Sequence, residues 1–129
     1  MKLLLDTNAL LWWLADSERL GPAARRSIAD PTNAIYVSAA SAWEIAIKIG
    51  LGKLNVPANA TTWLPAALAA NRFTSLPIEV EHALAVEQLP PHHKDPFDRL
   101  LIAQARIEGL TILTGDHNLE QYEVPIIRC

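Results

Sequence analysis

The sequence predicts an α/β protein, a three-layer α/β/α sandwich built on a roughly five-stranded parallel sheet. Two observations support this prediction. Short apolar runs alternate along the chain with longer segments whose apolar residues recur at helical spacing. Such alternation is typical of a parallel sheet with helices on both faces. The chain has 129 residues, 50% of them hydrophobic, so we expect a single domain over residues 1–129.

The first third of the chain contains two predicted strands and two predicted helices. Residues 2–5 form an apolar run that is typical of a buried strand, and residues 7–15 follow with leucines at helical spacing. Pro22 suits the first turn of a helix that continues to about residue 29. After a polar turn, residues 34–37 are predicted to form the second strand.

The remaining elements continue the alternation. Residues 39–49 form the strongest helix prediction, ended by a glycine, and residues 61–71 form an alanine-rich helix that tolerates Pro65 near its start. Gly109 is a C-terminal helix stop. Strands are also predicted at residues 73–76 (a weak one), 111–113 and 124–127. Helices are predicted at residues 78–88 and 96–108, and a short turn or helix at residues 116–121.

Four acidic residues lie at or near the ends of predicted strands or at the starts of helices. They are Asp6, Glu44, Asp98 and Asp116. In an open parallel sheet the groups just past the strand ends converge on one crevice. Carboxylates that converge there repel one another unless a cation lies among them. The pattern therefore predicts a metal-dependent site.

Each acid also has a structural interpretation. Asp6 and Asp116 can cap the helical turns that follow them, and Asp95 before Pro96 is a good helix cap. Asp98 suits the positive end of its helix, and Glu44 has both a capping-box spacing and an ion-pair spacing. If Ser38 caps the helix at residues 39–49, Glu44 lies one turn inside that helix and capping does not explain it. Capping also does not explain Asp98, because Asp95 is already an adequate cap for the same helix.

Four segments together resemble the motifs of PIN-domain proteins, most closely the VapC-like toxins of bacterial type II toxin–antitoxin pairs. They are LLLDTNALLWW, VSAASAWEIAIKIGLGKL, HHKDPFDRLLIAQARIEG and ILTGD. The resemblance implies a ribonuclease that uses Mg²⁺ or Mn²⁺, with Asp6, Glu44, Asp98 and Asp116 as the metal-binding and catalytic acids. It also implies supporting roles for the polar residues beside them, Thr7, Asn8, Thr114 and Asp95. The products implied carry a 5′-phosphate and a 3′-hydroxyl.

The donor chemistry agrees with that implication, because carboxylate oxygens favour hard cations such as Mg²⁺ and Mn²⁺. The histidines form no cluster with cysteine. We expect His92 and His93 to be loop residues near the cleft, and His82 and His117 to be surface residues. The candidates for contact with RNA phosphates are Lys48, Lys53, Lys94 and Arg99.

The partners follow from the resemblance, which implies an RNA substrate, a cognate antitoxin and a homodimer. Four tryptophans are many for this length, and we expect Trp43 and Trp63 to pack in the core. The absence of a long apolar stretch and the single cysteine, Cys129, favour a cytoplasmic protein without a membrane span. The net charge of −3 by itself favours a metabolic enzyme or binding module over a nucleic-acid-binding protein.

Two other functions stay open at this point. A non-catalytic PIN-like binding module would keep the fold without needing a metal. A receiver-type phospho-acceptor domain fits poorly, because Asp6 is followed by Thr7 and Asn8 and no lysine follows Lys94. An aspartyl phosphatase would have a second aspartate where Asn8 stands.

Overall fold

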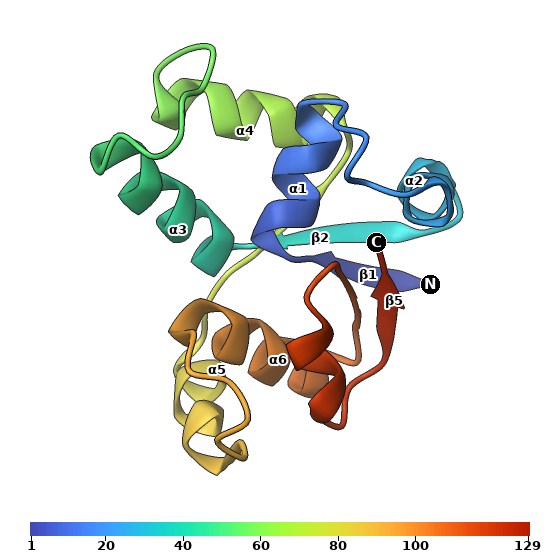
Figure 1. Ribbon diagram of the computed structural model, residues 1–129, viewed down its shortest axis with the longest axis vertical. Coiled ribbons are helices and arrows are strands. Elements are labelled where there is room, and N and C mark those ends of the chain that lie inside the picture. The colour runs from blue at the N-terminus through green and yellow to red at the C-terminus, as the bar shows by residue number, and fades with distance from the viewer.

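The computed structural model describes residues 1–129, and its strands form one sheet in which every neighbouring pair is parallel (Figure 1). The spatial order is β3-β2-β1-β4-β5. The strands are β1 (Lys2–Leu5), β2 (Ala34–Ser38), β3 (Thr74–Leu76), β4 (Thr111–Thr114) and β5 (Ile126–Arg128). The predicted five-stranded parallel sheet is therefore confirmed.

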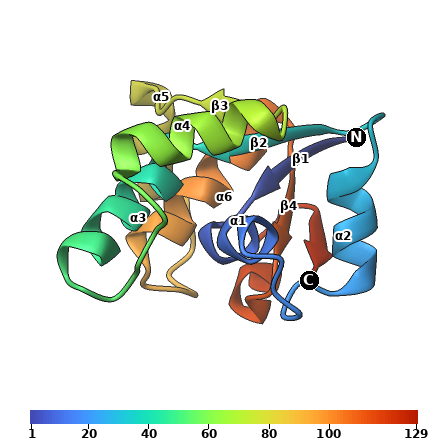
Figure 2. The ribbon, with the colours of Figure 1, turned by 90° about the horizontal axis from the view of Figure 1, so that it is seen from above.

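Helices cover both faces of this sheet, as predicted. They are α1 (Thr7–Leu14), α2 (Pro22–Ala29), α3 (Ala39–Gly50), α4 (Ala60–Ala70), α5 (Val80–Ala85) and α6 (Pro96–Glu108), with short 3₁₀ turns η1 (Val86–Gln88) and η2 (His117–Gln121). Helices α1, α2 and α4 lie on one side of the sheet, and α5 and α6 on the other (Figures 1 and 2). No helix is long and apolar enough to span a bilayer.

The central strand β1 explains why the sequence requires two helical layers. Leu3 and Leu5 belong to the hydrophobic core under α1 and α2, whereas Leu4 belongs to the core under α6. All three side chains are fully buried. Successive side chains of a strand point to opposite faces, so a continuous leucine run needs cover on both sides.

Several predicted boundaries differ from the structure by one or two residues, and at β5 and α4 the structure shows a local cause. The segment predicted as one helix at residues 78–88 is the shorter α5 followed by η1, and it ends at Gln88 as predicted because Pro90 favours the extended conformation observed at Leu89 (ψ 138°). Strand β5 begins only after Pro125, which has no N–H for the ladder. Helix α4 begins one residue early, because the Asn59 side chain accepts a 3.0 Å hydrogen bond from the N–H of Thr61.

Candidate functional site

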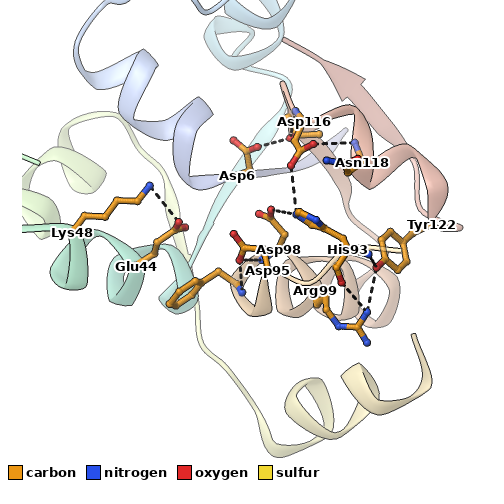
Figure 3. A network of polar contacts seen from close by, with 12 residues as sticks. Asp6, Glu44, Lys48, His93, Asp95, Asp98, Arg99, Asp116, Asn118 and Tyr122 are labelled. Carbon is orange, nitrogen blue, oxygen red and sulfur yellow. Dashed lines mark hydrogen bonds and ion pairs between the residues drawn. The ribbon is translucent and has the colours of Figure 1, made fainter. Parts of the chain in front are cut away.

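A cleft lies at the C-terminal ends of β1, β2 and β4, where the four predicted acids meet. None of the side chains that line it is hydrophobic. The lining residues are Asp6, Thr7, Asn8, Glu44, Lys48, His93, Asp95, Asp98 and Asp116. Figure 3 shows acidic side chains from different elements directed toward this common space. The convergence predicted from the parallel topology is therefore present.

Asp6 lies deepest, at the junction between β1 and α1. Its Oδ1 accepts a 2.7 Å hydrogen bond from the N–H of Ala9, so it caps α1, and its Oδ2 accepts a short hydrogen bond from the Thr114 hydroxyl. Burial raises the pKa of Asp6 to about 6, and the negative charges of Asp116 and Glu44 add to that rise. Capping and membership in the acidic site therefore coexist in one side chain.

Asp98 is half-buried and lies in the first turn of α6. Asp95 is the cap of this helix, with its Oδ1 accepting hydrogen bonds from the N–H groups of Phe97 (2.8 Å) and Asp98 (3.2 Å). Burial raises the pKa of Asp98 to about 6, with further contributions from Asp95 and Asp6 and an opposing one from His93. Asp98 is thus free of the capping role and faces the cleft.

Asp116 closes the opposite wall, just after β4. The Thr114 hydroxyl oxygen accepts a 3.0 Å hydrogen bond from the N–H of Asp116, and Asp116 Oδ1 accepts a 2.9 Å bond from the N–H of Asn118. Its other oxygen, Oδ2, lies 3.5 Å from His93 Nε2. Because Thr114 also donates to Asp6, one hydroxyl links the first and last of the four predicted acids.

Glu44 completes the set from α3. Ser38 caps this helix by accepting a 2.9 Å hydrogen bond from the N–H of Ala40, so Glu44 lies beyond the capping turn as predicted. The capping-box interpretation with Ser41 was wrong, because the Ser41 hydroxyl accepts a 3.0 Å hydrogen bond from Thr7 instead. The Glu44 carboxylate pairs with Lys48 at 3.3 Å, and both side chains line the cleft.

The basic residues proposed to contact phosphate differ in their positions. Lys48 lines the cleft, whereas Lys53 and Lys94 are exposed residues outside its lining. Arg99 donates instead to four backbone carbonyls of the chain segment before α6 and to the Tyr122 hydroxyl. The prediction of a phosphate contact for Arg99 is not supported, because its guanidinium is already engaged in holding this segment.

His93 is a loop residue beside the cleft as expected, and its Nε2 lies 2.8 Å from Asp98 Oδ2, so it belongs to the site. Another histidine and a tryptophan differ from expectation. His82 was predicted at the surface but is 1% exposed, where it caps α5 and pairs with Glu108. Trp43 was expected in the core but is 60% exposed, with one edge against Phe97. No periodicity in the sequence signals any of these placements.

The chemistry of this donor set fits a hard divalent cation. Five carboxylates line the cleft, those of the four predicted acids and of Asp95, with one lysine and one histidine as the nearby basic groups. The pKa values of Asp6 and Asp98 are raised mainly by burial and, to a smaller extent, by repulsion from the neighbouring carboxylates. A divalent cation would relieve that repulsion and match the oxygen donors.

This fold and this acidic cleft define a nuclease-like class, and sequence comparison identifies the family. The model of the PIN domain matches residues 3–125, so the chain belongs to the PIN domain family. A similar curated protein is Ribonuclease VapC22 of Mycobacterium tuberculosis, 29% identical over 122 residues, which cover 95% of this chain and 92% of that protein. Ribonuclease VapC16 of the same organism is 42% identical over 59 residues, which cover 46% of this chain and 40% of that protein.

Solved structures share the fold at low sequence identity. The structure of VapBC2 from Rickettsia felis bound to a promoter DNA fragment has a TM-score of 0.74 and 14% identity, covering 100% of this chain and 99% of that chain. DNA-bound VapBC from Salmonella typhimurium has a TM-score of 0.68 and 16% identity, covering 99% and 98%. A toxin–antitoxin complex from Klebsiella pneumoniae has a TM-score of 0.59 and 17% identity, covering 97% and 95%.

Proposed function

We propose that this protein is a metal-dependent endoribonuclease that hydrolyses RNA phosphodiester bonds in the cytoplasm as the toxin of a toxin–antitoxin pair. One observation carries the proposal: Asp6, Glu44, Asp98 and Asp116 meet in a single polar cleft although they are far apart in the sequence. Membership of the PIN family and similarity to two proteins named as ribonucleases support it. The proposed products carry a 5′-phosphate and a 3′-hydroxyl.

Within this proposal the four acids hold Mg²⁺ or Mn²⁺, with Asp6 as the central ligand. The bound cation would supply Lewis-acid activation of water and neutralise charge on the scissile phosphate. Thr114 and the N–H of Ala9 fix the two oxygens of Asp6, so the carboxylate has little freedom to rotate. Asp95 supports Asp98 by anchoring the first turn of α6.

Lys48 is the residue best positioned to bind a substrate phosphate. Its ammonium group lies 3.3 Å from Glu44 at the cleft wall and is about one third exposed. When Glu44 turns toward a cation, Lys48 becomes available for a phosphate oxygen. Asn8 lines the same cleft and is exposed, so its amide could contact the RNA, whereas the Thr7 hydroxyl is committed to Ser41.

The proposal includes two protein partners, an antitoxin and a second copy of the chain. A structural neighbour is named as a toxin–antitoxin complex, which supports the first partner. For the homodimer, Trp43 and Ile47 of α3 and Leu51 at its C-terminal cap are exposed apolar side chains at helical spacing, with 60%, 38% and 64% exposure. Large apolar side chains on one helical face favour a protein interface.

The direct test is cleavage of a mixed RNA substrate by the purified protein with Mg²⁺ or Mn²⁺, with and without EDTA. We expect cleavage that needs the cation and that Asp6→Asn, purified identically, lacks. Glu123→Gln is the matched control, because Glu123 is an exposed acid outside the cleft. Equal cleavage by Asp6→Asn would indicate a contaminating nuclease. Absence of cleavage by every variant would favour a non-catalytic binding module.

A further inference from the structure

We infer that His93 supplies a nitrogen ligand to the divalent cation, beside Asp98 and Asp116, and that the site therefore favours Mn²⁺ over Mg²⁺. The inference rests on the cation binding assumed in the proposed function, but it concerns a residue outside the four acids. Its basis is the geometry of three side chains from the loop before α6, from α6 itself and from the turn after β4 (Figure 3).

The spacing of the three donor atoms matches that of ligands to one cation. His93 Nε2 lies 2.8 Å from Asp98 Oδ2 and 3.5 Å from Asp116 Oδ2. Neighbouring ligands on an octahedral ion with bonds of about 2.1 Å are separated by about 3 Å. The two distances from His93 are close to that spacing and all three atoms lie within 4.8 Å of one another, so a cation could bridge them with small side-chain movements.

The backbone around His93 is held by an unusual number of hydrogen bonds. Its N–H donates to the Tyr122 hydroxyl at 2.9 Å, and Arg99 donates to its carbonyl at 3.3 Å and to Tyr122 at 3.2 Å. Arg99 also donates to the carbonyls of Val86, Leu89 and Pro90. Such support fixes the imidazole against the acids, as expected for a preorganised ligand.

The other cluster of histidine and acids provides a contrast. His82 lies beside Glu81 and Glu108, but its Nδ1 accepts a 2.9 Å hydrogen bond from the N–H of Glu79. Its Nε2 therefore carries a proton and donates to Glu108, which leaves no lone pair for a cation. His93 Nε2 also pairs with a carboxylate, that of Asp98, but no hydrogen bond to Nδ1 fixes this tautomer, so the proton can move to Nδ1 and leave the Nε2 lone pair for a metal.

The chemical consequence is cation selectivity. An imidazole nitrogen is a softer donor than a carboxylate oxygen and suits first-row transition metals better than Mg²⁺. A site with only carboxylates would discriminate weakly between Mg²⁺ and Mn²⁺. Addition of one nitrogen ligand should increase the affinity for Mn²⁺ relative to Mg²⁺.

The test uses Mn²⁺ as a paramagnetic probe in pulsed electron paramagnetic resonance. We expect electron spin echo modulation from a directly bound nitrogen in the wild-type protein, lost in His93→Ala and retained in His117→Ala, which removes an exposed imidazole next to Asp116. Isothermal titration should show Mn²⁺ affinity reduced at least about tenfold in His93→Ala, with a smaller change for Mg²⁺. Persistence of the modulation in His93→Ala would overturn the inference.

Isotope labelling of the wild-type protein gives a second test that does not depend on whether His93→Ala folds. Wild-type protein made with ¹⁵N-histidine should show the ¹⁵N coupling pattern, and a bound Mn²⁺ without any histidine coupling would refute the inference. Failure of this inference differs from failure of the proposed function. RNA cleavage without nitrogen coupling would support the proposed function and refute His93 as a ligand. Nitrogen coupling without RNA cleavage would support His93 as a ligand and refute the proposed function.

Discussion

Replacement of Asp6 by asparagine should stabilise the metal-free protein while it abolishes cation binding. Burial raises the pKa of Asp6 from 3.8 to about 6. At 1.36 kcal/mol per pKa unit, the ionised carboxylate lowers the free energy of unfolding by about 3 kcal/mol above pH 6. Asparagine has no charge, but its single amide oxygen cannot replace both carboxylate oxygens, which accept from Ala9 and Thr114, so one hydrogen bond worth about 1 kcal/mol is lost. The net expected gain is about 2 kcal/mol.

The assay is thermal unfolding at pH 7.5 in EDTA and then in Mn²⁺. For a chain of this length about 2 kcal/mol corresponds to a rise in Tm of about 8 °C. Mn²⁺ at a hundredfold above its Kd should stabilise the wild type by about 2.7 kcal/mol and leave Asp6→Asn nearly unchanged. The cation should therefore remove or reverse the difference between the two proteins.

The pH dependence of wild-type stability gives an independent check that the ionised Asp6 carboxylate destabilises the metal-free protein. Between pH 3.8 and about 6 folded Asp6 retains the proton that the unfolded chain has lost. The free energy of unfolding must therefore fall as pH rises through this window and level off above it. Asp6→Asn should show a smaller fall, since the raised pKa of Asp98 remains. A lower Tm for Asp6→Asn in EDTA at pH 7.5 would refute this account of the buried charge.

Three further predictions concern the cleft and the exposed face of α3. Asp98→Asn should reduce RNA cleavage on the order of a hundredfold and Asp116→Asn less, because Asp116 is the more exposed acid; equal initial rates for these two variants would contradict the ranking. Thr114→Val, which removes the hydroxyl between Asp6 and Asp116, should weaken Mn²⁺ binding about tenfold in calorimetry, and unchanged affinity would exclude a positioning role. Leu51→Lys, at a 64% exposed position, should shift a dimer to monomer in analytical ultracentrifugation while Tm stays nearly constant, whereas an unchanged dimer would place the interface elsewhere.

Most of the fold could be predicted because its determinants are local. The leucine run of β1 requires burial on both faces, and Asp6, Ser38 and Asp95 start helices through their own side chains. The errors are small shifts of element ends, and one of them has a clear cause, since β5 begins only after Pro125, which has no N–H for the ladder. The end of an element depends on tertiary context as well as on sequence spacing.

The four acids could be placed at one edge because parallel strands bring their ends together. His93 could be placed in a loop near the cleft, but its contact with Asp98 could not be predicted, since that contact depends on the loop held by Arg99 and Tyr122. Arginine is a residue type that often binds phosphate, but the hydrogen bonds of Arg99 show that it holds the backbone of a loop. The buried His82 escaped prediction for the same reason, because its partner Glu108 lies 26 residues away.

The most direct test of the account is an anomalous difference map from crystals of the wild-type protein grown with Mn²⁺. We expect a peak in the cleft within bonding distance, about 2 Å, of the carboxylates of Asp6 and Asp98. A peak confined to the Glu81–Glu108 cluster, or no peak at saturating Mn²⁺, would contradict the claim that these acids form a cation site.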